Sequence, residues 1–176
     1  RSMKPDRGEL LGDFAQDEGH ALEAMFRRTL NDPDLARDLA QETLLRAWSK
    51  RDDYDPSRPL RSWVFGIGIN LLRNHLRRRK LEQATLQPLG DLPREGREET
   101  PTKRLAKAER EEQLEGAIRA LPPSQQEVVL LRYQEGLSCQ EIADVVGTTP
   151  NAVSIKLYHA RKALRERLRD AAEETG

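Results

Sequence analysis

Side chains that could bind nucleic acid recur at helical spacing over residues 149–165 of this chain of 176 residues. Its cations, Lys156, Arg161, Lys162 and Arg165, could neutralise phosphate groups. Polar and apolar groups in the first turns of the segment could meet base edges in a major groove. The residues available for these contacts are Thr149, Asn151, Ser154, Ile155, Lys156, Tyr158, His159, Arg161 and Lys162. The chemistry that this pattern supports is non-covalent recognition of DNA.

A helix, a tight turn and a second helix are predicted around this segment, over residues 138–168. Ser138 and Glu141 form a capping-box pattern, and Gly147 can adopt the left-handed conformation that ends a helix. Thr149 is a suitable cap for the second helix, which then starts on a proline. The apolar positions of the unit are Leu137, Ile142, Ala143, Val153, Leu157, Ala160, Leu164 and Leu168. A helical hairpin with a solvated basic face is the alternative, but these offsets favour a DNA-binding helix-turn-helix.

The charge of the chain is balanced overall but unevenly distributed. Its formal net charge is zero with 34% charged residues, so a DNA-binding surface requires local segregation of charge. Basic residues gather over 73–80 and from Lys156 onward, whereas residues 32–42 and 95–115 lean acidic. These local patches, and not the total charge, are expected to meet DNA.

Metal, redox and catalytic chemistry find little support in the sequence. The single cysteine, Cys139, excludes an internal disulfide and forms no zinc-ligand pattern with His20, His75 and His159. A thiol in the first turn of a helix could serve redox sensing, yet a small filler residue is the simpler interpretation. We expect no catalytic residue, metal or cofactor, because no nucleophile with a base, carboxylate pair or phosphate-binding glycine loop is visible. A single cysteine is consistent with a reducing, cytoplasmic setting. No apolar run is long enough for a membrane span.

A second polar face is predicted on the helix that starts at Asp32 and Pro33, after an amphipathic helix over residues 20–30. The positions available for burial are Leu35, Leu39 or Ala36, Ala40, Leu44, Ala47 and Trp48. The positions left outside are Asp38, Gln41, Glu42 and Leu45. On spacing alone, a solvated helix face is the simpler interpretation of this acidic surface.

The next helix is predicted from Leu60, after a loop of aspartates and prolines over residues 52–59. Its apolar stripe is Trp63, Ile67 and Leu71, flanked by Val64 and Leu72. Gly66 and Gly68 each cost up to about 1 kcal/mol relative to alanine inside a helix, which suggests close approach by a neighbouring backbone or a ligand. Asn70 and Asn74 share a face that leads into the basic run, where a carboxamide could read a base edge or simply be exposed.

Helices without strand alternation are predicted along the whole chain, which indicates an all-α protein. Residues 83–102 are rich in proline and glycine and are interpreted as a flexible linker. This linker separates a helical domain over 8–82 from a second over 103–172. Ahead of the helix-turn-helix, the second domain is expected to pack through Leu105, Leu114, Ala117, Ile118, Leu121, Val128, Val129, Leu131 or Leu130, and Tyr133.

Three stretches of the sequence resemble those of bacterial sigma factors of the extracytoplasmic-function (ECF) group. They read DLAQETLLRAW, RPLRSWVFGIGINLL with the basic run after it, and LPPSQQEVVLLRYQEGLSCQEIADVVG. The resemblance covers the chain from about Ala21 to Leu168, in the family's order and with its linker in place. It implies two helical domains, sigma domain two and sigma domain four, that bind core RNA polymerase and direct it to promoters.

The resemblance also implies roles for the polar faces. The face with Asp38, Leu39, Gln41 and Glu42 would dock on the clamp helices of the large polymerase subunit, with a further polymerase contact at the flap region. The loop from Tyr54 to Arg58 and the helix after it would capture the minus-ten element as single-stranded DNA. The residues implied there are Tyr54, Arg58, Arg61, Trp63, Asn70, Arg73, Asn74, Arg77, Arg78 and Arg79. The helix-turn-helix would read the minus-thirty-five element as duplex, and an anti-sigma factor is an expected partner.

The sequence departs from the family pattern at Ile155, where serine is frequent, and at Gly68, where alanine is usual. A free-standing transcriptional regulator is the alternative to a sigma factor. It explains the helix-turn-helix but leaves RSWVFGIGINLL and its basic tail unexplained. Transcripts that depend on core polymerase would separate the two hypotheses.

Overall fold

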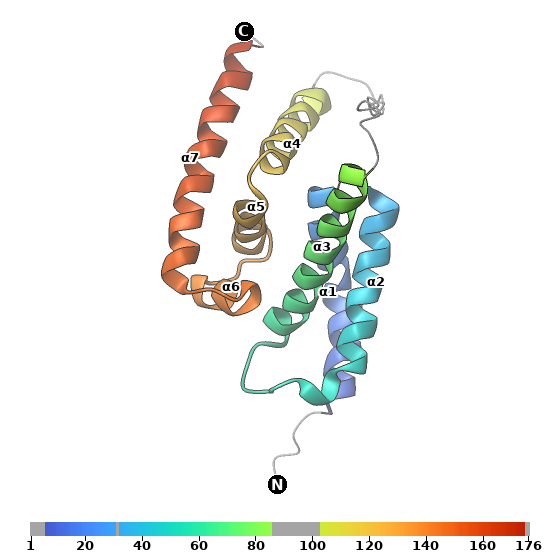
Figure 1. Cartoon of the computed structure of the whole chain (residues 1–176). Coiled ribbons are helices and arrows are strands. Elements are labelled where there is room, and N and C mark those ends of the chain that lie inside the picture. The colour runs from blue at the N-terminus through green and yellow to red at the C-terminus, as the bar shows by residue number, and fades with distance from the viewer. Residues whose placement is uncertain (1–5, 31, 86–102, 175–176) are drawn as a thin grey trace.

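The computed structural model describes residues 6–30, 32–85 and 103–174, and every regular element in these ranges is helical (Figure 1). The first domain contains α1 (Arg7–Leu30), α2 (Pro33–Ser49), the 3₁₀ turn η1 (Arg51–Asp53) and α3 (Leu60–Thr85). The second domain contains α4 (Lys103–Arg119), α5 (Pro123–Val129), the π-helical turn η2 (Leu130–Gln134), α6 (Cys139–Val146) and α7 (Pro150–Glu174). The predicted all-α fold with two domains is confirmed. Of the predicted linker, residues 86–102 lie outside the described ranges, and α3 continues to Thr85.

The first domain is a three-helix bundle in which α1 packs against both α2 and α3. α1 begins at Arg7, well before the predicted start, because Leu11 and Phe14 add a further buried turn to its apolar face. Leu22, Met25 and Phe26 of α1 have no exposed surface and form the centre of the bundle. The helix that follows is capped as predicted, since the Asp32 carboxylate accepts the N–H of Leu35 at 3.2 Å.

The buried stripe of α3 is rotated from the predicted one. Val64, Phe65, Ile69 and Leu72 are almost completely buried, whereas Trp63 and Ile67, predicted at the centre of the stripe, are only partly buried. The prediction was wrong because α3 has apolar residues on several sides, and it packs against α1 and α2 on one side and α6 on another. Leu71 is buried as expected.

The close approach predicted at the glycines of α3 occurs at Gly68, but with side chains and not with a backbone, and at Gly66 the neighbouring backbone is at ordinary contact distance. A Cβ at Gly68 would lie 3.1 Å from the ring of Phe26 and 3.4 Å from Thr43, and both neighbours are fully buried. A Cβ at Gly66 would lie 3.8 Å from the carbonyl oxygen of Val145 in α6. Gly68 therefore makes room for neighbouring side chains, and Gly66 faces the backbone of the second domain.

The π-helical turn η2 changes which residues of the second domain are buried. The Glu135 N–H donates to the carbonyl of Leu130 at 3.2 Å, and this wide turn buries Leu130 and Leu131 together. Tyr133, predicted to pack, is instead 59% exposed. Leu114 of α4 is also exposed, against prediction, whereas Ala117 and Ile118 are buried as predicted. The side chain of Leu105 lies outside the described residues.

The helix-turn-helix forms as predicted from α6 and α7. Ser138 and Glu141 make a reciprocal capping box, and Gly147 ends α6 with φ 73° and ψ 50°. The Thr149 hydroxyl accepts the N–H of Ala152 at 3.2 Å and so caps α7. Val153 returns the chain to the core with no exposed surface.

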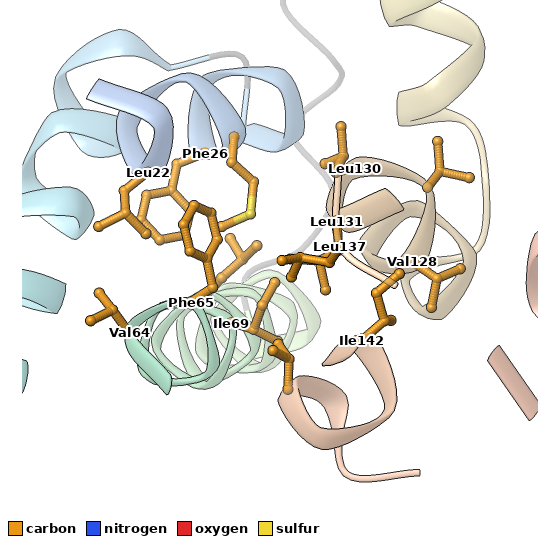
Figure 2. Close-up of a cluster of buried hydrophobic side chains, with 14 of the residues drawn as sticks. Leu22, Phe26, Val64, Phe65, Ile69, Val128, Leu130, Leu131, Leu137 and Ile142 are labelled. Atoms are coloured by element: carbon orange, nitrogen blue, oxygen red, sulfur yellow. The ribbon is translucent and has the colours of Figure 1, made fainter. Parts of the chain in front are cut away.

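The two domains share one hydrophobic core, in which α3 packs against α6. Figure 2 shows Phe65 and Ile69 of α3 on the side of the first domain that faces Leu131, Leu137 and Ile142 of the second. In Figure 1, α7 lies on the far side of the second domain from α3. The exposed face of α7 is therefore separate from the contact between the domains.

Candidate nucleic-acid interface

The exposed face of α7 is formed by Asn151, Ile155, Tyr158, His159 and Lys162, which are all solvent-accessible. Val153, Leu157 and Ala160 are buried and lie on the opposite side of the helix. Each set keeps to one side because seven positions make about two turns of an α-helix. Ile155 is 50% and Tyr158 58% exposed, so both large side chains are available for contact with a partner. The ring of Tyr158 packs edge-on against that of His159, with centroids 5.5 Å apart. This face offers a carboxamide, apolar groups and a cation to a duplex.

Three other residues predicted for duplex contact lie at the margins of this face. The Ser154 hydroxyl donates to the carbonyl of Pro150 at 3.0 Å, and Lys156 is half-buried. Arg161 turns back toward its own helix, where its Nε donates to the carbonyl of Leu157 at 3.3 Å. It borders an apolar groove between α4, η2 and α7 that the sequence did not reveal. The groove is lined by Leu114, Tyr133, Tyr158, Arg161, Leu164, Arg165 and Leu168.

The capping box makes the stability of α6 depend on pH. The hydrogen bond from the Ser138 backbone holds the pKa of Glu141 below the usual glutamate value. Because the pKa is lower in the folded state, the carboxylate stabilises the fold above the usual glutamate pKa, and this contribution is lost as pH falls through the folded pKa.

We expect Glu141→Gln to lower the free energy of unfolding at neutral pH by about 0.3–1 kcal/mol, since it removes a charge at a helix start. The difference between the two proteins should shrink as the solution is acidified. Thermal unfolding followed by circular dichroism at neutral and acidic pH measures this. A difference that does not change with pH would contradict the role of the charge.

One exposed stripe of α3 contains five side chains separated by three or four positions. Asn70, Asn74 and Arg77 are exposed, Trp63 and Ile67 are partly buried, and Arg78 and Arg79 are exposed at the end of the helix. The carboxamide oxygen of Asn74 accepts a hydrogen bond from the guanidinium of Arg77. The structure thus brings an aromatic ring, two carboxamides and a cation together on one face.

The loop before α3 is held by Tyr54, which is 5% exposed. Its hydroxyl donates to the carbonyl of Arg58 at 2.7 Å, and its ring lies 5.2 Å from that of Trp63. Burial raises the pKa of Tyr54, with a smaller contribution from Asp55. Asp55 closes the loop by accepting the Ser57 N–H at 2.9 Å, a hydrogen bond that lowers the pKa of the carboxyl. Tyr54 therefore supports the loop from inside, and Arg58 is its exposed cation.

Arg61 and Arg73, both predicted to contact DNA, are occupied by carboxylates of the second domain. Arg61 pairs with Glu18 of α1 and, at 2.5 Å, with Glu135 after η2. Arg73 binds both carboxylate oxygens of Glu127 in α5, at 2.8 and 2.6 Å. Burial raises the pKa of Glu135, although the hydrogen bond from Arg61 opposes this, whereas the hydrogen bond to Glu127 raises the pKa of Arg73. The structure therefore does not place these arginines with the exposed stripe of α3.

The predicted outer face of α2, including Leu45, is exposed, and Trp48 extends it beyond the prediction. Asp38 and Gln41 are exposed as predicted, and Glu42 is partly exposed and paired with Arg46 at 2.6 Å. Leu39, predicted to meet a partner, is only 6% exposed, because it packs in the core of the bundle.

Two large apolar residues, Leu45 and Trp48, continue this face and are 68% and 48% exposed. Trp48 was predicted to be buried, but Thr43 and Ala47 take the buried positions, and Trp48 follows Ala47 by about 100° around the helix. The Arg51 guanidinium lies 5.2 Å from the Trp48 ring. Gln41, Leu45 and Trp48 are three or four positions apart, and residues at this spacing share one side of a helix. This spacing could have placed Trp48 on the exposed face.

A polar groove between α2 and α3 brings the two predicted sites of the first domain together. Its lining consists of Leu39, Glu42, Arg46, Leu71, Asn74, His75, Arg77, Arg78 and Leu81. Glu42 and Arg46 at the edge of the polar face of α2 therefore lie beside the basic end of α3. One partner could contact both.

Comparison with known proteins decides the family. Residues 14–82 match the family model described as Sigma-70 region 2, and residues 111–164 match that described as Sigma-70, region 4. The RNA polymerase sigma factor CnrH of Cupriavidus metallidurans is 34% identical over 133 residues, which cover 72% of this chain and 70% of that protein. The ECF RNA polymerase sigma factor SigF of Caulobacter vibrioides is 32% identical over 154 residues, covering 87% and 82%. The chain belongs to the ECF group of RNA polymerase sigma factors.

Solved structures agree with this assignment. A structure of CnrH in complex with the cytosolic domain of CnrY superimposes with a TM-score of 0.66 at 28% identity, covering 93% of this chain and 89% of that one. The sigma factor RpoE in complex with the anti-sigma factor NepR from Bartonella quintana shares the fold, with a TM-score of 0.68 at 24% identity, covering 89% and 97%.

This sigma factor therefore binds core RNA polymerase and directs promoter-specific initiation of transcription. The match to region 2 covers RSWVFGIGINLL and its basic tail, which a free-standing regulator left unexplained. Sigma factors are initiation factors without a catalytic role of their own. Among the described helices, none combines the length and apolar character needed to cross a membrane.

Proposed function

We propose that the first domain, residues 8–82, captures the minus-ten element as a single strand. The exposed stripe of α3 carries this proposal, because Trp63, Asn70 and Arg77 offer a stacking surface, a group that reads base edges and a phosphate contact on one face. Extruding a base costs a few kcal/mol of unstacking. Stacking on an aromatic ring returns about 1–3 kcal/mol per base, so this surface can offset the cost of opening.

The second domain, residues 103–172, reads the minus-thirty-five element as duplex through the exposed face of α7. The Asn151 carboxamide can pair with the edge of an adenine, and Ile155 can contact a thymine methyl group. Lys162 provides a phosphate contact. The serine frequent in the family at position 155 is thus replaced by an apolar contact, which favours thymine over bases without a methyl group.

Core polymerase docks on the α2 face, which we define as Asp38, Gln41, Leu45 and Trp48. The exposed fractions of Leu45 and Trp48 support this proposal, since exposed apolar groups rimmed by polar ones mark interaction sites. By family resemblance the partner is the pair of clamp helices of the large subunit, and the flap region meets the second domain. The factor contributes no catalytic group and acts in the cytoplasm with the polymerase.

An anti-sigma factor is the expected inhibitor of this protein. CnrH was solved with the cytosolic domain of CnrY, and RpoE with the anti-sigma factor NepR. We therefore expect a protein that binds the free sigma factor and competes with core polymerase.

Transcription from a genomic DNA library tests the proposed function. Discrete start sites are expected when the chain and core polymerase are both present, and none when either is omitted. Mapping the starts then gives the promoter elements. Tight, sequence-specific duplex binding by the chain alone, without polymerase-dependent transcripts, would instead support the free-standing regulator.

A further inference from the structure

The groove between α2 and α3 has an apolar floor and charged walls. Leu39 of α2 and Leu71 of α3, each 6% exposed, lie at its base, where the two helices pack side by side (Figure 1). The groove has a volume of about 440 Å³, within the range of ligand-binding clefts. Because buried leucines fix its floor, the groove can receive part of a partner without rearrangement of the bundle.

The walls of the groove carry more positive than negative charge. Its lining includes three guanidinium groups, those of Arg46 from α2 and of Arg77 and Arg78 from α3, against one carboxylate, that of Glu42. All three arginines are exposed, and Glu42 pairs with Arg46 at 2.6 Å. A guanidinium presents several N–H donors in a planar fork that matches the oxygens of a phosphate. The groove therefore favours an anion with more than one acceptor oxygen.

The two neutral polar residues of the lining favour the same kind of ligand. The Oδ1 atom of Asn74 accepts a hydrogen bond from Arg77, which leaves the Nδ2 group of Asn74 to donate. The imidazole of His75, which is partly buried, can donate from a ring nitrogen. Donors thus reach the groove from two neighbouring positions of α3 as well as from the arginines.

We propose that this groove binds a phosphodiester group of single-stranded DNA and that Arg46 of α2 is one of the residues that hold it. The inference rests on the proposed role of α3 in holding the melted strand. Asn74 and Arg77 belong both to the exposed stripe of α3 and to the lining of the groove, so a strand bound along the stripe passes beside the groove. Its phosphate then meets Arg46 on one wall and Arg78 on the other.

Glu42 sets how strongly the groove binds a phosphate. It occupies Arg46 in the free protein, but the two side chains are 46% and 51% exposed, and exposed pairs four positions apart on a helix are weak. A phosphate can therefore take the place of Glu42 as the partner of Arg46. The displaced carboxylate stays close to the strand and repels it, so Glu42 lowers the affinity of the groove.

Arg46→Gln tests the phosphate contact, and Arg37→Gln is its matched control. Arg37 is another exposed arginine of α2 that pairs with a carboxylate of its own helix, Asp34, at 3.4 Å. It lies nine positions from Arg46 and so on the opposite side of α2. Fluorescence anisotropy gives the affinity of each free chain for fluorescein-labelled oligothymidylate over a range of salt concentrations.

We expect Arg46→Gln to lower the slope of log affinity against log salt by about 0.7, the contribution of one phosphate contact in a single strand. This corresponds to about fivefold weaker binding in about 0.1 M salt and to no difference near about 1 M. Arg46→Lys keeps the charge and should keep the slope. Arg37→Gln should bind as the wild type does.

Glu42→Gln should tighten binding about twofold, because it releases Arg46 from a weak pair. Asp34→Asn, the matched change beside Arg37, should have no effect. These two variants and Arg46→Lys decide the matter if Arg46→Gln loses its helical circular dichroism. An unchanged slope in Arg46→Gln, or an equal change in Arg37→Gln, would overturn the proposal. An equal change on the duplex of oligothymidylate with oligodeoxyadenylate would overturn the assignment to the single strand.

Transcription of a genomic DNA library with core polymerase separates failure of the groove from failure of the proposed function. Transcripts that depend on the wild-type chain, together with an unchanged salt slope in Arg46→Gln, would reject the groove and leave capture of the minus-ten strand standing. A lower slope in Arg46→Gln without transcripts from the wild-type chain would reject the promoter role and leave the groove as a site for single-strand phosphates.

Discussion

Replacing Leu45 by lysine lowers the affinity of the sigma factor for core RNA polymerase by about ten- to a hundredfold. Leu45 is 68% exposed at the centre of the α2 face, and burying a leucine in an interface is worth about 1.5–3 kcal/mol. Each 1.4 kcal/mol corresponds to a factor of ten in affinity. Because the side chain touches little of its own domain, the fold should be unaffected.

The affinity of labelled sigma factor for core polymerase, measured by titration, checks this expectation. Ala15→Lys adds the same charge at an exposed position of α1 and should bind core polymerase as the wild type does. Lysine at both Gln41 and Glu42 should also weaken binding, since it reverses the acidic character of the same face. Unchanged affinity in the Leu45 variant would remove Leu45 from the interface.

Replacing Asn70 by alanine reduces promoter opening about tenfold and leaves the affinity for core polymerase unchanged. Asn70 is exposed at the centre of the α3 stripe, so its replacement should leave the core of the bundle unchanged. In the complex its carboxamide would pair with an unstacked base, and a lost hydrogen bond of that kind costs about 1–3 kcal/mol.

Permanganate reactivity of unpaired thymines in the promoter measures opening, and the same holoenzyme preparations provide the core affinity. Gln16→Ala removes an exposed carboxamide from α1 and should open promoters normally. Parallel loss of opening and of core affinity would show that Asn70 acts on polymerase binding and not on the melted strand.

The sequence by itself determined the features whose causes are local. The capping box of Ser138, the left-handed Gly147 and the Thr149 cap were predictable, because each depends on a few neighbouring residues. The face of α7 was predictable for the same reason, since its apolar residues form a single stripe and leave Asn151 and Ile155 outside.

Only the tertiary structure decided which side of an ambiguous helix is buried. α3 carries apolar residues on several sides, and its contacts with α1 and α6 favour Val64 and Ile69 over Trp63. α2 likewise turns Leu39 inward and Trp48 outward. The partners of Arg61 and Arg73 in the second domain, Glu135 and Glu127, lie more than fifty residues away in the sequence. Charge and spacing alone show that such arginines can bind an anion; the packing of the domains determines that, in the free chain, the anion is a carboxylate of the protein itself.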